Sequence, residues 1–216
     1  MKKVVIIYLY FGFFIPFAFS QNGVHLEDGL FLKRVENNMF QGQYNLNGKG
    51  NIEKLFFGDF NAMVEFYYCS PYQGEYGFRI IKKNLLYVLE VKHISNFDEI
   101  REKKSEERLK LCKIEVHTYP INTQFAEDLY KNMVSCISNF EAKIVSDPNL
   151  VPIIRGGYSV TFRTVIDKAV LWSLWVQNPN ENALRMTDLC KQIAADAKAD
   201  KLDETAYITV LNTFEN

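Results

Sequence analysis

Segments in which apolar and polar side chains alternate constrain the fold of this chain most strongly. They run over residues 60–69, 76–91 and 158–176, and a short apolar run at 55–57 precedes the first of them. Alternation with a period of two places successive side chains on opposite faces of a β-strand. Two-residue turns are expected at Gly58-Asp59, Lys83-Asn84 and Asp167-Lys168. The pattern therefore predicts an antiparallel sheet of about five to seven strands, a meander plus a C-terminal hairpin.

The two expected turns at 83–84 and 167–168 also predict which residues face each other. In the first hairpin Ile80 lies opposite Tyr87, on an apolar face. In the second hairpin Arg163 lies opposite Trp172, on a face of mixed polarity.

Helical periodicity appears in three places and complements the strands. A helix is expected over residues 97–109. Five acidic and five basic side chains lie in the stretch 98–110, which indicates that this helix is solvated. Residues 123–140 and 183–198 each have an apolar stripe, while 206–214 fit a helix or a strand equally well. The predicted class is α+β, with two or three amphipathic helices packed on one face of the sheet; the element order is unlike a Rossmann fold.

The first twenty residues have the features of an export signal. Lys2 and Lys3 precede a long uncharged stretch, and small residues, Ala18 and Ser20, stand before Gln21. A membrane anchor is the alternative, but the apolar run is short for a spanning helix. We predict cleavage after Ser20, a single domain over 21–216 with an irregular lead-in at 21–50, and a secreted or periplasmic location without a later membrane span.

Composition narrows the classes of function. The chain has 216 residues, of which 48% are hydrophobic and 14% aromatic, so it is unlike disordered or fibrous proteins. Its formal net charge of −1 is unlike that of a dedicated nucleic-acid binder. Nucleic acid is therefore not an expected partner.

Catalytic motifs are missing from the sequence. There is no G-x-S-x-G elbow and no C-x-x-C pair, and the three histidines are widely spaced. We predict no catalytic residue, metal or cofactor, and interpret His93 and His117 as residues at strand ends. The alternative is that their strands are neighbours and that, with Glu115 or Glu90, they bind zinc or perform acid–base chemistry.

The four cysteines are expected to be core residues or disulfide partners. An oxidising compartment favours at least one bridge, and the sequence does not choose the connectivity. They are Cys69, Cys112, Cys136 and Cys190.

The aromatic residues suggest binding. Trp172 beside Arg163 on an exposed sheet face would suit a sugar, a peptide or a partner protein, although a covering helix would make Trp172 a core residue. Tyr72 and Tyr76, around the 70–74 loop, form a weaker candidate. The predicted function is that of an exported, non-catalytic binding protein with a protein or envelope ligand as partner. The alternative is a small exported hydrolase with a carboxylate–histidine site.

Overall fold

The computed structural model describes residues 23–25, 31–37, 52–53, 55–58, 60–140, 157–166, 170–179 and 181–214, with the backbone alone at 23–25, 31–37, 105 and 170. The predicted leader, residues 1–20, lies outside these ranges, as does most of the lead-in at 21–50. No helix in the described part is long and apolar enough to cross a bilayer.

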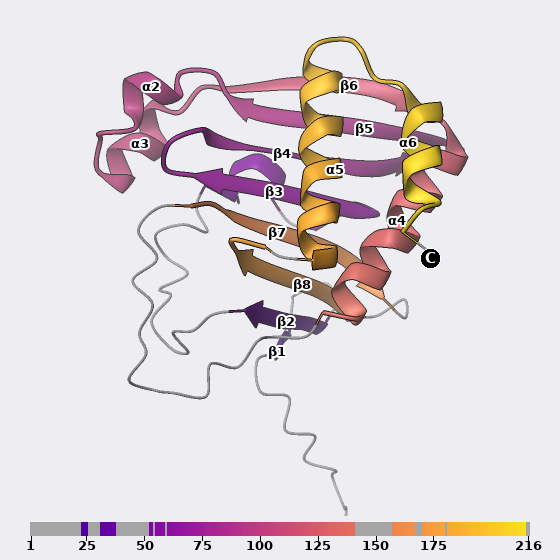
Figure 1. The fold of residues 1–216 in the computed structure, drawn as a ribbon. Coiled ribbons are helices and arrows are strands. Elements are labelled where there is room, and N and C mark those ends of the chain that lie inside the picture. The colour runs from indigo at the N-terminus through magenta and orange to yellow at the C-terminus, as the bar shows by residue number, and fades with distance from the viewer. Residues whose placement is uncertain are drawn as a thin grey trace, which may run out of the picture.

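An eight-stranded sheet forms the centre of the protein, in the order β1-β2-β8-β7-β3-β4-β5-β6 (Figure 1). The strands are β1 (Gly23–His25), β2 (Phe31–Asn37), β3 (Val64–Ser70), β4 (Gly74–Lys83), β5 (Leu86–Ile94), β6 (Ile114–Ile121), β7 (Ser159–Ile166) and β8 (Val170–Gln177). All neighbours are antiparallel except β2 and β8. The antiparallel α+β prediction is confirmed. The sheet has eight strands instead of five to seven, and two of them, β1 and β2, lie in the lead-in that the sequence predicts to be irregular.

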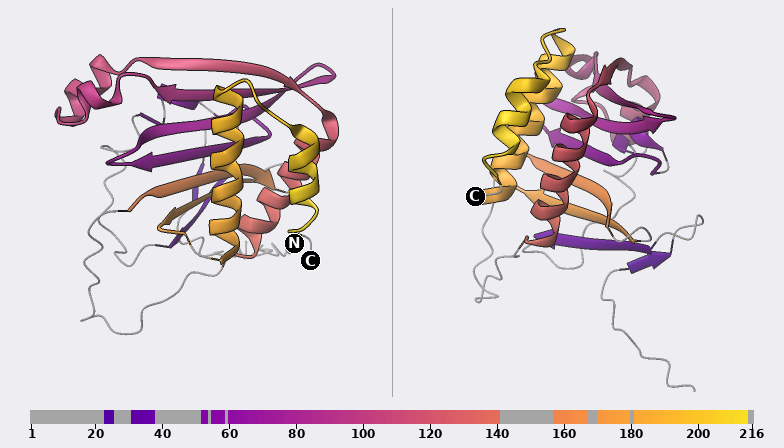
Figure 2. Two further views of the ribbon diagram at one scale, coloured as in Figure 1. Left: turned by 45° about the horizontal axis from the view of Figure 1, so that its top comes forward. Right: turned by 90° about the vertical axis from the view of Figure 1, so that its right-hand side faces the viewer.

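Three helices cover one face of this sheet (Figure 2). They are α4 (Thr123–Ser138), α5 (Glu181–Lys198) and α6 (Glu204–Leu211). Asn122 begins α4 by accepting hydrogen bonds from the backbone N–H groups of Gln124 and Phe125, and Asp203 begins α6 by accepting one from Ala206. The segment 206–214, whose sequence fits a helix or a strand, therefore forms most of a helix, α6.

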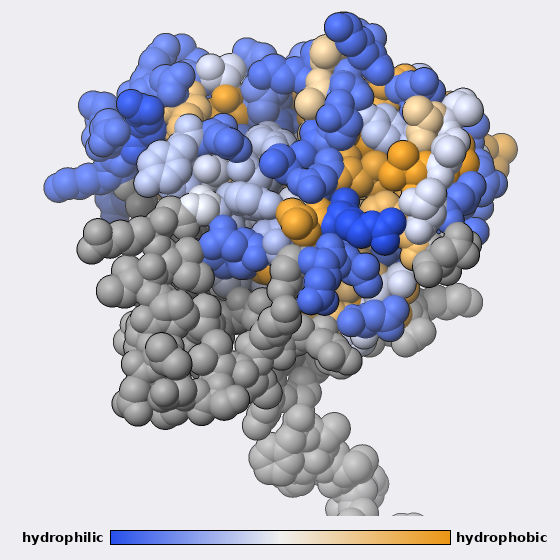
Figure 3. All heavy atoms as spheres, viewed as in Figure 1, coloured by the Kyte–Doolittle hydropathy of each residue, from blue (hydrophilic) through white to orange (hydrophobic). Residues whose placement is uncertain are grey.

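The main hydrophobic core lies between these helices and the sheet. Its centre is a row of phenylalanines on three adjacent strands, Phe66, Phe78 and Phe162, each fully buried. Hydrophobic side chains remain visible between α5 and α6 in the space-filling view, while much of the surrounding surface is hydrophilic (Figure 3). A second cluster packs on the opposite face of the sheet and consists of Ile52, Phe56, Phe57, Tyr67, Ile94 and Ile100.

The β4–β5 hairpin forms as predicted but with its pairing moved by two residues. Its turn is Asn84-Leu85, with Asn84 in the left-handed region at φ 59°, and Ile80 pairs with Leu89 instead of Tyr87. A shift of two residues keeps every side chain on its predicted face. The predicted apolar face is therefore correct although each predicted pair is not.

The β7–β8 hairpin differs from its prediction by one residue, which has a larger consequence. Arg163 pairs with Ser173, and Trp172 pairs with Thr164. A shift of one residue moves all side chains of the second strand to the other face. Trp172 therefore packs against the main core on the helix-covered face, whereas Arg163 lies on the opposite face.

Two predicted elements are wrong in kind or extent. Residues 55–57 are helical, not a strand, and pack onto the sheet through the second cluster. The helix predicted at 97–109 is two helices, α2 (Phe97–Ile100) and α3 (Ser105–Leu111). No apolar residue lies between Ile100 and Leu109 that could pack against the sheet. Because helices in proteins depend on such packing, the helix is interrupted there.

Candidate functional site

Strand β6 is the outer strand of the sheet on the side of the β4–β5 hairpin (Figure 1). Just before it, the backbone N–H of Ser95 donates to the carbonyl of Lys113 at 2.9 Å. Along an antiparallel pair, hydrogen-bonded residue pairs alternate with pairs that are not hydrogen-bonded. Counting from Lys113 in steps of two, Glu115, His117 and Tyr119 therefore direct their backbone N–H and C=O groups toward β5. The backbone groups of the intervening residues, among them Val116 and Thr118, point away from the sheet.

The outward side of β6 is open in the part of the chain that the structure describes. No backbone hydrogen bond outside the pairing with β5 is found there for Ile114, Val116 or Thr118. Pro120 also occupies an outward position, where its missing N–H costs no bond within the sheet. Val116 is 51% exposed. The edge can accept a further strand over 114–118.

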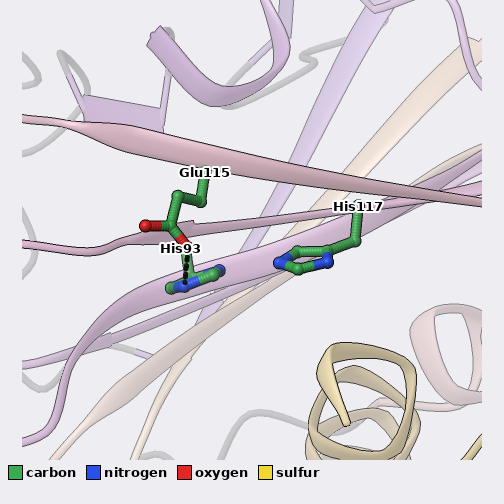
Figure 4. A group of neighbouring side chains, drawn as sticks. All are labelled: His93, Glu115 and His117. Atoms are coloured by element: carbon green, nitrogen blue, oxygen red, sulfur yellow. Dashed lines mark ion pairs between the residues drawn. The ribbon is translucent and has the colours of Figure 1, made fainter. Parts of the chain in front are cut away.

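Three polar side chains meet on the face of this edge that looks toward α5. Register pairs His93 of β5 with Glu115 of β6, and Val91 with His117. Residues two apart along β6 share a face, so all three side chains gather there (Figure 4). His93 Nε2 lies 3.2 Å from a carboxylate oxygen of Glu115, and the imidazole rings of His93 and His117 stack with centroids 5.5 Å apart.

The surroundings of His93 favour its neutral form. Burial lowers the pKa of His93, and the positive charge of Lys198 in the last turn of α5 lowers it further, whereas Glu115 opposes the shift. His93 is 8% exposed, and its Nδ1 has no hydrogen-bond partner among the described residues. The end of α5 is held beside the edge because the Tyr119 hydroxyl donates to the carbonyl of Ala197 at 2.5 Å.

The aromatic candidates from the sequence do not form one surface. Trp172 and Arg163 lie on opposite faces, so the juxtaposition predicted for them is wrong. Tyr76 is partly buried and stacks on Tyr68 at 4.6 Å, while Tyr72 is 71% exposed in the turn between β3 and β4. Their roles in binding stay predictions, with Tyr72 the most accessible.

The expected disulfide is absent. All four cysteines lie in the described part of the chain, and each is a thiol. Cys136 and Cys190 pack in the main core, where burial raises the pKa of Cys136 to about 12 and that of Cys190 well above its ordinary value. Cys69 and Cys112 pack against the second cluster. The buried pair behaves as small apolar groups and is poorly suited to nucleophilic chemistry.

A buried row of charges crosses the face away from α4, α5 and α6, and the sequence analysis missed it. Glu65 pairs across the strands with Arg79 and Arg163. Arg79 bonds Glu90 at 2.7 Å, and Arg163 bonds Glu65 at 3.2 Å. Glu65 is 2% exposed, and burial raises its pKa to about 7 although Arg163 lowers it.

The same row holds the helical residues 52–53 and 55–57 on the sheet. Arg163 also pairs with Glu53, Arg79 donates to the carbonyl of Phe57 at 3.0 Å, and Lys92 donates to that of Phe56. The ring of Phe57 packs over Gly77, where an added Cβ would press against the Phe66 carbonyl. The row therefore has a structural use. Its contact with Arg163 could not be predicted from the sequence because β3 and β7 are distant in the chain.

Comparison of the chain with known proteins identifies no relative: no family model, curated protein or solved structure matches it.

Proposed function

We propose that the protein is exported and acts as a non-catalytic binding protein, which takes an extended segment of a partner protein as an additional strand beside β6. The observation that carries this proposal is the open outer side of β6, where backbone groups of residues 114, 116 and 118 have no partner among the described residues. The leader-like residues 1–20 support export to the periplasm or the medium.

Strand addition gives the open edge of β6 a use. Backbone hydrogen bonds supply affinity in this mode, and alternate side chains supply specificity. Many natural sheets shield such edges because open strands associate with other chains. Here Pro120 limits pairing at one end, and the exposed Val116 offers an apolar contact at the middle.

The test compares Val116→Pro with Val116→Thr in the tagged protein. Proline removes the outward N–H at position 116 and no bond to β5, whereas threonine keeps the N–H and the β-branched shape. Proteins of the host envelope fraction are captured on each variant and identified. Amide exchange in the complex then reports protection at 114, 116 and 118.

We expect the threonine variant to capture the same partner as the unchanged protein and the proline variant to lose it. Equal capture by both variants, at similar melting temperatures, would exclude strand addition at this edge. Association of the protein with itself, measured by light scattering, would identify a second copy as the occupant and would contradict the proposed separate partner.

The alternative, a small exported hydrolase, draws on one observation. His93 Nε2 lies 3.2 Å from a carboxylate oxygen of Glu115, which is within hydrogen-bond reach for acid–base chemistry. Hydrolysis of a simple ester or peptide substrate that disappears in Glu115→Gln would favour it over the binding function. Activity that survives this substitution would come from elsewhere and would dismiss the site as catalytic.

A further inference from the structure

Two imidazoles and a carboxylate lie together at the β5–β6 edge. Coordinating atoms of His93, Glu115 and His117 all lie within 4.8 Å of one another. We propose that these three side chains bind a divalent transition-metal ion, with Zn²⁺ as the preferred ion. This goes beyond strand addition, which uses the backbone of β6 and requires no metal.

The distances are close to those of an occupied site. Ligand atoms about 2.0–2.2 Å from a tetrahedral zinc ion stand roughly 3.3–3.6 Å apart. His93 Nε2 and the Glu115 carboxylate oxygen are already 3.2 Å apart. The remaining separations close by side-chain rotation, which the exposed Glu115 and the partly exposed His117 can make because only His93 is buried.

The scaffold holds the three side chains in place. They stand on two adjacent rungs of one antiparallel pair, and elements of regular structure position ligands more accurately than loops do. His93 Nε2 is the ring nitrogen that faces the Glu115 carboxylate, so it is the one placed to bind the ion, while the buried Nδ1 has no hydrogen-bond partner in the described ranges.

The donor set selects the type of ion. Imidazole nitrogen suits Zn²⁺, Cu²⁺ and Ni²⁺, whereas Ca²⁺ and Mg²⁺ prefer oxygen ligands alone. Lys198 is the opposing charge nearby, and its side chain is exposed at the end of α5, where it can turn toward solvent. Three protein ligands leave one position for water or for a group of a bound partner.

Titration of the metal-stripped full chain with Zn²⁺, followed by calorimetry, tests the site. Co²⁺ serves as a second probe because its visible spectrum reports tetrahedral coordination. Glu115→Gln and His117→Ala alter the exposed ligands and should leave the metal-free fold intact, which thermal melting checks. Val116→Thr is the matched control, since position 116 lies between them on the other face of the strand.

We expect one equivalent of Zn²⁺ to bind, with an affinity at least about tenfold lower in each ligand variant and unchanged in the control, because even outer-shell changes cost that much. Absence of binding to the unchanged protein would overturn the proposal, as would full affinity in the Glu115→Gln/His117→Ala double variant. Val116→Pro should still bind zinc. Failure of the metal site is thereby distinguished from failure of strand addition.

Discussion

The two faces of the central strands carry opposite chemistry at adjacent positions. On β3, β4 and β7, the helix-covered face presents Phe66, Phe78 and Phe162 in one row. One residue away, the other face presents the charged row of Glu65, Arg79 and Arg163. Both rows are largely buried, but the first is covered by the helices α4, α5 and α6 and the second by the helical residues 52–53 and 55–57.

This difference shows how each face obtains its stability. The apolar row gains free energy from area removed from water and from close ring contacts. The charged row must replace lost hydration by ion pairs and hydrogen bonds, and one oxygen of Glu65 is left without a partner among the described residues. We therefore expect the apolar face to dominate stability and the charged face to dominate its dependence on pH.

The largest effect is expected at the centre of the apolar face. Phe66→Ala removes a fully buried ring that lies 5.5 Å from Phe78 and 5.6 Å from Phe162, between ring centroids. It should lower the free energy of unfolding by about 3–5 kcal/mol, measured by chemical denaturation. A loss below about 1 kcal/mol would break the proposed contrast between the two faces.

Trp172→Ala tests the face assigned to β8. Because Trp172 packs partly buried against the main core, we expect a loss of about 2–3 kcal/mol and a clear drop in melting temperature. Arg163→Lys on the opposite face serves as the comparison. Unchanged melting of the alanine variant would place Trp172 on the surface and restore the register predicted from the sequence.

Glu65→Gln tests the charged face through pH. The folded-state pKa of Glu65 is raised from 4.5 to about 7, so its contribution is fully present below pH 4.5 and is lost as pH rises through 7. Glutamine keeps the shape and cannot ionise. Relative to the unchanged protein, the variant should gain on the order of 1–3 kcal/mol between pH 5 and pH 8. Parallel pH profiles for the two proteins would show that Glu65 titrates normally.

The smallest effect is expected outside both faces. Tyr72→Ala replaces a 71% exposed side chain in a turn and should change stability by less than about 0.5 kcal/mol. Any change in partner capture by this variant would then report binding and not unfolding. A large loss of stability would mean that the turn packs against another part of the protein.

Local pattern predicted the elements of this fold better than their partners. The alternation of apolar and polar residues predicted the strands of both hairpins, and the amphipathic stripes predicted α4 and α5, because these signals lie within short stretches of chain. The register of β7–β8 depends on its turn, and an error of one residue placed Trp172 on the wrong face. The charged row around Glu65 needs β7 beside β3, which no local pattern specifies.

The candidate site shows the same limit. The sequence indicates that His93 and His117 would meet if their strands were neighbours, but it does not specify that β5 and β6 pair. Once they pair, the rungs at 93–115 and 91–117 place the three side chains on one face. The open outer side of β6 likewise depends on the order of the whole sheet.

Residue-resolved amide hydrogen exchange along β6 tests the proposed binding edge most directly. We predict fast exchange at Ile114, Val116 and Thr118, whose N–H groups point outward, and slow exchange at Glu115, His117 and Tyr119, whose N–H groups bond β5. Equal, strong protection at all six positions in the isolated protein would show that the edge is already covered and would contradict its use for an added strand.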